Sequence, residues 1–372
     1  MRVPFFQSPW KSDKAAASRL AEVLSSGSYV AGHEGEAFES EFSDWLGGRE
    51  VVGVNSGTDA LFLALTALGI GSPDEVVLPS YTFIACLEAV VRVGAVPVLV
   101  DSMPGSFLSG PEQIEPVVNS ATRAILAVPL FGDTTGQLRL HAFCRRHGLL
   151  FIEDVAQACG GYIADEDGGH RLVGTLGHAS AFSFYPTKTL GAAGDSGAVS
   201  FGDPAHAERC RALRNHGLHR GEHCEIGINS RLDALQAGLL RIGLRNLGGN
   251  LQRRSEIADR YIRAMADLPL LCLPERSFGN AWNYFVVRHP HRDQLRLRLA
   301  NLGVETRVYY SRPLHRESAY LRRFPAVRLP NCEKLAEQAL ALPLYPAMTT
   351  DQIDCVVDSV ARACGSSLAA QT

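Results

Sequence analysis

The sequence lacks the features that would direct it to a membrane or to nucleic acid. Its apolar runs, such as VVRVGAVPVLV, are short and interrupted by Gly94 and Pro97, so we expect no transmembrane helix. A formal net charge of −3 provides no general attraction to nucleic acid or to an anionic membrane, and any phosphate site must therefore be local. The N-terminal stretch MRVPFFQSPWKSDKAA also lacks the long apolar segment of a signal peptide.

Cysteine pairs with metal-site or redox spacing are missing as well. The nine cysteines are odd in number and scattered, and none of them forms a C-x-x-C pair. This pattern indicates reduced thiols rather than disulfides, and it argues against a zinc site. We therefore expect a cytoplasmic protein that holds no structural metal.

The 372 residues are instead arranged as alternating strands and helices, with enough length for two domains. Between Val51 and Phe201 the apolar segments VVGVN, EVVLPS, VPVLVD, AILAVPLF, LLFIED, ASAFSF and GAVSF are separated mostly by helical stretches. Strands that are apolar throughout predict a mostly parallel sheet covered on both faces, an α/β fold. Ligands of such sheets bind at the carboxyl ends of the strands.

The last third of the chain reads as a smaller α+β unit. Two helical stretches are expected at Leu232–Asn246 and Leu251–Leu268, followed by strands near NYFVVRH and VETRVYY. We place the domain boundary between the two helical stretches. Residues 1–247 then form a large domain with an N-terminal arm, and residues 248–372 form a small domain.

Lys188 is the first candidate for chemistry, in the stretch SFYPTKTLGAAGDSGAV. It follows a short apolar run and precedes a glycine-rich loop. Partial burial disfavours the charged ammonium and leaves a nucleophilic amine, which is what a carbonyl cofactor needs to form a Schiff base. Taken alone, an exposed loop lysine is the more common interpretation.

Two other strand ends carry candidate residues. The sequence Asn55-Ser56-Gly57-Thr58 lies between a strand and an apolar helix, where free amide groups favour an anion, although ordinary N-capping is equally compatible. Asp154 ends the apolar run FIED, and a buried carboxylate there needs a cationic partner. A helix-capping aspartate is the alternative.

The order of these parts is more informative than any one of them. A phosphate cradle, an aspartate about a hundred residues later and a lysine after a later strand are what pyridoxal phosphate requires. The aspartate keeps the ring nitrogen protonated, and the lysine holds the aldehyde. Ser183 can add a hydroxyl to the phosphate site, and Phe83 can pack on the ring, although a core position is the more common fate of a phenylalanine.

Seven segments resemble, in order and spacing, the DegT/StrS-type sugar aminotransferases: NSGTDALFLALTALGIG, EVVLPSYTF, GAVPVLVD, FIEDVAQA, SFYPTKTLGAAGDSGAV, NHG and INSRLDALQAG. The resemblance extends from about Phe5 to beyond residue 350. It implies a homodimeric pyridoxal-phosphate enzyme with the aspartate-aminotransferase fold (fold type I). It also implies pyridoxamine 5'-phosphate as the intermediate form of the cofactor.

The resemblance also implies roles for individual residues. Lys188 and Asp154 are the catalytic pair, and the other cofactor contacts are Gly57, Thr58, Phe83, Gln157, Ser183 and Asn229. Asn229 and the substrate contact Arg231 are expected to act across the dimer interface. Tyr185, Tyr309 and His315 are the remaining expected substrate contacts.

One departure from the family pattern concerns the substrate. Many relatives carry histidine in a VHYP segment, where this chain has Tyr309 within VYYSRPLH. That position lies on the sugar side of the site in the family, so the change affects substrate identity rather than the cofactor.

The resulting prediction is an aminotransferase that uses an amino acid, with L-glutamate favoured, and a nucleotide-linked keto sugar. C3 of the sugar is favoured over C4, and the product is assigned to antibiotic or surface-glycan amino-sugar biosynthesis. Alternatives are sugar dehydration, aminohydroxybenzoate formation or a non-catalytic regulatory role. Sugar dehydratases of this type carry histidine in place of the lysine, and the presence of Lys188 disfavours them.

Overall fold

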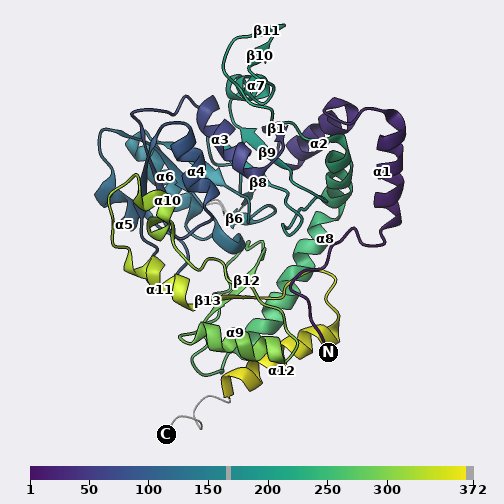
Figure 1. Ribbon diagram of the computed structural model, residues 1–372, viewed down its shortest axis with the longest axis vertical. Coiled ribbons are helices and arrows are strands. Elements are labelled where there is room, and N and C mark those ends of the chain that lie inside the picture. Colours follow the sequence, from purple (N-terminus) through teal and green to yellow (C-terminus); the bar gives the residue numbers. More distant parts are fainter. Residues whose placement is uncertain (165–168, 366–372) are drawn as a thin grey trace.

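A computed structural model describes residues 1–164 and 169–365 (Figure 1). Its centre is a seven-stranded sheet in the order β1-β9-β8-β5-β4-β2-β3. The strands are β1 (Glu50–Val54), β2 (Glu75–Pro79), β3 (Val96–Val100), β4 (Thr122–Ala127), β5 (Leu150–Asp154), β8 (Ala179–Ser183) and β9 (Gly197–Phe201). Only β9 runs antiparallel to its neighbours β1 and β8 among these strands. The predicted α/β fold with a mostly parallel sheet is confirmed.

Both faces of this sheet are buried, which explains why its strands are apolar throughout. Val76 and Leu78 of β2 pack in one core, while Val77 between them packs in a core on the opposite face. The helices of this part of the chain are α1 (Lys14–Ser26), α2 (Gly32–Trp45), α3 (Gly57–Ala67), α4 (Ala85–Arg92), α5 (Pro111–Ile114), α6 (Gln137–His147) and α7 (Pro204–Leu213). Phe42 of α2 packs its ring against Phe182 of β8, and Phe38 packs against Phe184 just after that strand.

A single helix, α8 (Ala234–Met265), replaces the two helical stretches expected from the sequence. Gly248 and Gly249 weaken a helix, but α8 continues through them because both of its halves are packed. Leu240 and Leu247 join the core beside α2, and Tyr261 joins the core of the C-terminal unit. Figure 1 shows α8 running from the upper part of the molecule to the lower part. The proposed domain boundary at 247/248 falls inside this helix, and the division stays a prediction.

The C-terminal unit combines a two-stranded sheet with helices. Strand β12 (Phe285–Arg288) pairs antiparallel with β13 (Ala339–Leu342). The helices are α9 (Arg292–Asn301), α10 (Ser318–Leu321), α11 (Pro330–Gln338) and α12 (Thr350–Gly365). The prediction of a strand in VETRVYY is wrong, since this segment makes just two isolated bridges, from Val304 to Val3 and from Arg307 to Ala341. Further along this segment, the carbonyl of Tyr309 and the amide of Tyr310 bond instead to the Tyr81 hydroxyl.

The remaining elements are short. They are the hairpin of β6 (Tyr162–Ala164) and β7 (His170–Leu172), the hairpin of β10 (Leu218–His219) and β11 (Glu222–His223), and 3₁₀ turns at Glu115–Val117, Leu130–Gly132 and Leu314–Arg316. The β10–β11 hairpin projects beyond α7 (Figure 1). Ile226, just after this hairpin, is 98% exposed. None of the helices described is both long and apolar enough to span a membrane.

Candidate active site

Neighbouring strand ends bring Asp154 and the Lys188 loop together. Asp154 ends β5 and is paired with Ala181 of β8, which runs parallel to it. Strand β8 ends at Ser183, five residues before Lys188. The loop then turns back on itself, with the Lys188 amide donating to the Tyr185 carbonyl at 2.9 Å. Lys188 is half-buried at this edge of the sheet.

The Asp154 carboxylate is buried and has two hydrogen-bond donors. Its Oδ1 accepts from the Ala156 amide at 3.1 Å, and its Oδ2 accepts from the Cys86 thiol at 3.0 Å. Burial raises the pKa of the Asp154 carboxyl, while these two bonds and the charge of Lys188 act to lower it. Because burial is the strongest of these influences, the carboxylate favours a further cationic partner.

The N-terminus of α3 and the end of β8 meet in a polar cradle formed by Ser56, Gly57, Thr58 and Ser183. Ser56 caps the helix by accepting from the Asp59 amide at 3.1 Å, and the first-turn amides of Gly57 and Thr58 have no partner within the helix. A Cβ atom at Gly57 would lie 2.6 Å from the Cβ of Ser183, so only glycine permits this close approach. The segment therefore caps its helix and keeps free donors, and its use as a phosphate site stays a prediction.

Gln157 and Phe83 both contact Tyr310, a residue that sequence reasoning missed. Gln157 accepts from the Phe131 amide and donates to the Tyr310 hydroxyl, each at 2.9 Å. The Phe83 ring lies 5.8 Å from the Tyr310 ring and is 49% exposed. Burial raises the pKa of the Tyr310 hydroxyl, and nearby Asp154 raises it further. The one available signal was its place beside Tyr309 in VYYSRPLH.

Tyr309 and Tyr185 lie next to the Lys188 loop. The Tyr309 ring packs 4.6 Å from the Tyr284 ring, and the Tyr284 hydroxyl is 2.9 Å from the hydroxyl of Thr187. Burial, followed by the neighbouring Tyr284, raises the pKa of Tyr309, and Tyr185 is near enough to contribute. Tyr185 itself is exposed. Tyr185 thus lies in the Lys188 loop and Tyr309 is linked to that loop through Tyr284, while their contact with substrate stays a prediction.

His315 does not fit its expected role as a substrate contact. Its side chain is 0% exposed. Its Nδ1 lies 2.7 Å from the Ser80 hydroxyl and its Nε2 lies 3.1 Å from Glu333. With both ring nitrogens engaged inside the protein, no part of the ring faces a ligand. The family resemblance implied a substrate contact here, but the fold turns this histidine inward.

Asn229 and Arg231 lie on the segment that follows the β10–β11 hairpin. Asn229 is exposed, and Ser230 beside it donates to the Asn55 side chain at 3.0 Å, two residues before Gly57. Arg231 is half-buried, donates to Asn215 at 3.3 Å and has a buried Nε without a partner. This segment is therefore attached beside the polar cradle, and the action of these two residues across an interface stays a prediction.

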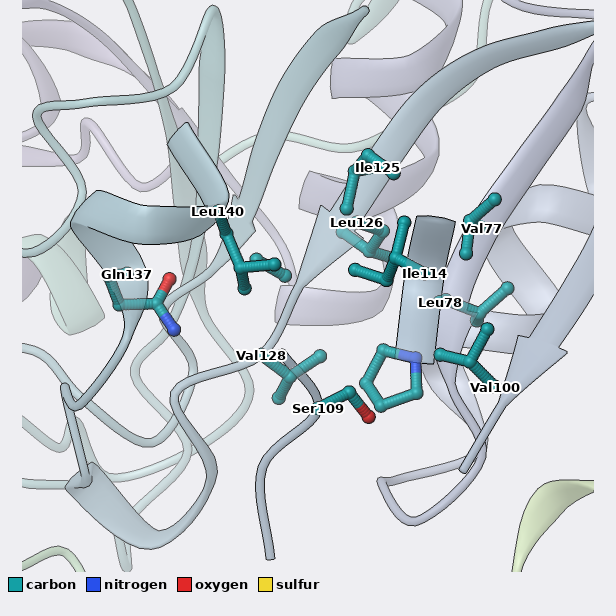
Figure 2. Close-up of a pocket in the computed structure, with 12 residues that line it drawn as sticks. Val77, Leu78, Val100, Ser109, Ile114, Ile125, Leu126, Val128, Gln137 and Leu140 are labelled. Carbon is teal, nitrogen blue, oxygen red and sulfur yellow. The ribbon is translucent and has the colours of Figure 1, made fainter. Parts of the chain in front are cut away.

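A small cavity elsewhere in the molecule does not belong to this site. It has a volume of about 10 Å³ and lies between β2, β3, β4, α5 and α6, where Figure 2 shows side chains such as Ile114, Leu126 and Leu140 around it. That volume is about the space of one water molecule. Within 1–164 and 169–365, no cluster of three or more histidine, cysteine, aspartate or glutamate residues is arranged to hold a metal ion.

Comparisons with known proteins decide the family. The model of the DegT/DnrJ/EryC1/StrS aminotransferase family matches residues 11–361. The chain belongs to this family. It is 44% identical over 339 residues to "Erythromycin biosynthesis sensory transduction protein EryC1" of Saccharopolyspora erythraea, covering 90% of this chain and 91% of that one. It is 41% identical to the dTDP-3-amino-3,4,6-trideoxy-alpha-D-glucose transaminase of Streptomyces venezuelae, covering 96% and 95%.

Solved structures of family members agree. The S. venezuelae aminotransferase DesV, solved with a ketimine intermediate, superposes with a TM-score of 0.92 at 41% identity, covering 97% of this chain and 98% of that one. NtdA from Bacillus subtilis, solved with bound cofactor PMP, gives a TM-score of 0.88 at 30% identity, covering 98% and 85%. The predicted family, fold type and dependence of this aminotransferase on pyridoxal phosphate are confirmed.

The residues of this DegT/DnrJ/EryC1/StrS family member fit that cofactor. The cradle of Gly57, Thr58 and Ser183 offers amide and hydroxyl donors to a phosphate, and a side chain at Gly57 would fill it. Asp154 is a buried carboxylate suited to a protonated ring nitrogen, and Lys188 lies close enough to influence it. The residues predicted to hold the phosphate, the ring and the aldehyde thus lie at one edge of the sheet.

Proposed function

We propose that this chain transfers an amino group from an amino acid, L-glutamate in the first instance, to the C3 keto group of a nucleoside-diphosphate-linked sugar. The observation that carries this proposal is the meeting of Asp154 and Lys188 at adjoining strand ends, beside the cradle at Gly57. The C3 position rests on relatives whose names specify 3-amino sugars. The product would serve the synthesis of antibiotic or surface-glycan amino sugars.

Each residue has a defined task in this proposal. When bound, pyridoxal phosphate supplies an electron sink for the carbanion formed at the donor's α-carbon. Asp154 would hold the positive charge of the ring nitrogen, and Lys188 would hold the aldehyde through its amine. When that amine is free, it is placed to act as general base and then as general acid at the α-carbon of the donor.

The surroundings of Lys188 define where the sugar would bind. Tyr185 is exposed on the loop itself, the Tyr284 hydroxyl lies 2.9 Å from the Thr187 hydroxyl, and the Tyr309 ring packs against Tyr284. Aromatic rings with polar tips suit a sugar, which has apolar faces and hydroxyl edges. We assign this tyrosine cluster to the sugar, with Tyr309 occupying the position where many relatives carry histidine.

A homodimer in the cytoplasm completes the proposal. Asn229, which the family resemblance assigns to the site of a second copy, lies three residues after the almost fully exposed Ile226, so we place the dimer interface at this segment. The mass of the protein in solution, measured by light scattering after gel filtration, is expected to be twice that of one chain. Ile226→Asp is expected to raise the monomer fraction, and Leu297→Asp, on exposed α9, serves as the matched control.

Two relatives carry names that describe regulation rather than catalysis, including the "Pleiotropic regulatory protein" of Geobacillus stearothermophilus, which is 36% identical. A purely regulatory protein has no need to keep Lys188, Asp154 and the Gly57 cradle together. Their presence at one edge of the sheet supports catalysis in this chain. The presence of Lys188 likewise disfavours the sugar dehydratase reaction.

Substitution of Lys188 tests the proposal directly. The protein is incubated with pyridoxal phosphate, reduced with borohydride and digested, and the cofactor is expected on the peptide that contains Lys188. Lys188→Ala is expected to lose this label and to lower turnover of a TDP-linked 3-amino sugar with 2-oxoglutarate by at least a hundredfold. Lys11→Ala, at an exposed position, is the control. Full turnover by the Lys188→Ala protein would overturn the assignment.

A further inference from the structure

A buried chain of hydrogen bonds reaches Asp154 from α4 and the turn before it. Cys86 has no exposed surface, and its Sγ lies 3.0 Å from Oδ2 of Asp154. The hydroxyl of Thr82, also buried, lies 3.7 Å from the same sulfur. A thiol has a single proton, so when Cys86 donates to the carboxylate, Thr82 must donate to the sulfur. The direction of the chain is therefore Thr82 to Cys86 to Asp154.

The thiol is suited to be the donor in this chain because it stays neutral. Burial raises the pKa of Cys86, and the negative charge of Asp154 raises it further. The hydrogen bond from Cys86 acts in the opposite direction on its partner and lowers the pKa of the Asp154 carboxyl. A neutral, buried thiol thus supports the ionised form of the carboxylate without adding a second charge.

We propose that Cys86 is a positioning residue for Asp154, which fixes the orientation of the carboxylate and keeps it ionised. The ionised carboxylate would hold a protonated ring nitrogen, and this role rests on the function proposed above.

The other groups around Asp154 show why a separate donor is useful. The titratable side chains that face it are Cys86, Lys188 and Tyr310, and the Ala156 amide completes the set. Tyr310 adds no charge, because burial raises the pKa of its hydroxyl. Lys188 changes its bonding partner during the proposed reaction. Cys86 and the Ala156 amide are therefore the donors that stay constant while Lys188 is engaged elsewhere.

A pH series on the cofactor-free full-length protein separates positioning from simple packing. The unfolding equilibrium is measured in urea between pH 4 and 7.5, below the range where an unfolded thiol ionises. The hydrogen bond stabilises only the ionised carboxylate. We therefore expect the gap in stability between wild type and Cys86→Ala to widen as pH rises through the folded pKa of Asp154. The ratio of the unfolding equilibrium constant of Cys86→Ala to that of wild type should be about five- to tenfold larger at pH 7.5 than at pH 4.

Two further variants make this test specific. Cys86→Ser restores a hydrogen-bond donor and is expected to recover much of the stability that Cys86→Ala loses as pH rises. In the Asp154→Asn background, the change in stability caused by Cys86→Ala is expected to be the same at every pH. A gap that is independent of pH in both backgrounds would mean that Cys86 only fills space, and the proposal would be overturned.

Cofactor binding gives a second readout. The affinity for pyridoxal phosphate, followed by quenching of protein fluorescence, is expected to weaken at acidic pH as Asp154 becomes protonated. In Cys86→Ala this loss should begin at a higher pH than in wild type. A protein that binds no pyridoxal phosphate at any pH would contradict the proposed function, while the urea series would still decide the role of Cys86. An unchanged binding profile in Cys86→Ala would count against the proposal.

Discussion

Glu153 and Asp154 are consecutive buried carboxylates of β5 with very different surroundings. Successive residues of a strand point to opposite faces, so each meets its own set of partners. Glu153 accepts from the amides of Gly174, Leu176 and Gly177 and from the Ser180 hydroxyl, at 2.7 to 3.1 Å. Asp154 accepts from one amide and one thiol.

The difference between them separates a structural carboxylate from a functional one. Four donors, together with the nearby guanidinium of Arg49, satisfy Glu153 within the fold and hold the turn that leads into β8. Asp154 has a thiol, a weak donor, in place of a stronger one, and burial raises its pKa. A buried charge that its own fold leaves incompletely compensated is characteristic of a binding or catalytic site.

Asp154→Asn is expected to have the largest effect, and the effect should fall on cofactor binding rather than on folding. Loss of a buried charge partner weakens affinity for pyridoxal phosphate by about a hundredfold to a thousandfold, equivalent to about 3–4 kcal/mol. The folded pKa of Asp154 is raised, so its ionised form opposes folding once the pH exceeds that value. The cofactor-free variant should therefore match or exceed wild-type stability at pH 7.5. A fluorescence titration and urea unfolding measure the two quantities.

Glu153→Ala is expected to show the opposite pattern. Removal of the acceptor leaves buried donors unsatisfied and lowers the free energy of unfolding by about 3 kcal/mol. Glu153→Gln, which keeps one oxygen, is the milder control. Urea unfolding and thermal melting provide the measurement. Wild-type stability of Glu153→Ala, or a larger loss in Asp154→Asn, would break the distinction between the two carboxylates.

His315→Ala extends the comparison to a buried group on the structural side, with a smaller effect. It removes the ring that bonds to Ser80 and Glu333 and is expected to cost about 1–2 kcal/mol of stability, with KM for the nucleotide sugar unchanged. Asn is a suitable control substitution because it keeps hydrogen-bonding groups. A selective rise in KM, with stability preserved, would restore His315 as a substrate contact.

The titration of His315 gives a related prediction. Burial lowers its pKa in the folded protein below the unfolded value of about 6.5. The neutral ring therefore contributes stability above about pH 6.5, and that contribution is lost as pH falls through the folded pKa. Wild type should lose more stability than His315→Ala between pH 7 and pH 5. Equal losses in the two proteins would show that the titration of another group causes the loss of stability at acidic pH.

Several parts of the site were predictable because they depend on local pattern. Strand ends follow from apolar runs, and parallel strands place their carboxyl ends at one edge, which is enough to bring Asp154 towards Lys188. Gly57 and Ser183 followed from the same rule, and their close approach accounts for the glycine. The single α8 helix was not predictable in this way, since packing at both ends decides whether a helix continues through two glycines.

The misassigned and missed residues share one cause. Cys86 lies in an apolar helical segment that reads as core, and its contact with Asp154 joins residues 68 positions apart. His315 was expected to contact substrate, yet its ring bonds to Ser80, which lies 235 positions away. Such pairs depend on how helices and loops pack against the sheet, and no local periodicity reports that.

The sequence by itself determined the class of fold, the order of its strands along the chain and the lysine, aspartate and glycine that a phosphorylated aldehyde requires. These follow from hydrophobic periodicity and from the chemistry of single side chains. Only the tertiary structure decided which buried carboxylate is fully hydrogen-bonded, which histidine is enclosed and which thiol reaches Asp154. The reason is that the charge state of a buried group depends on donors and solvent exclusion supplied by residues distant in the chain.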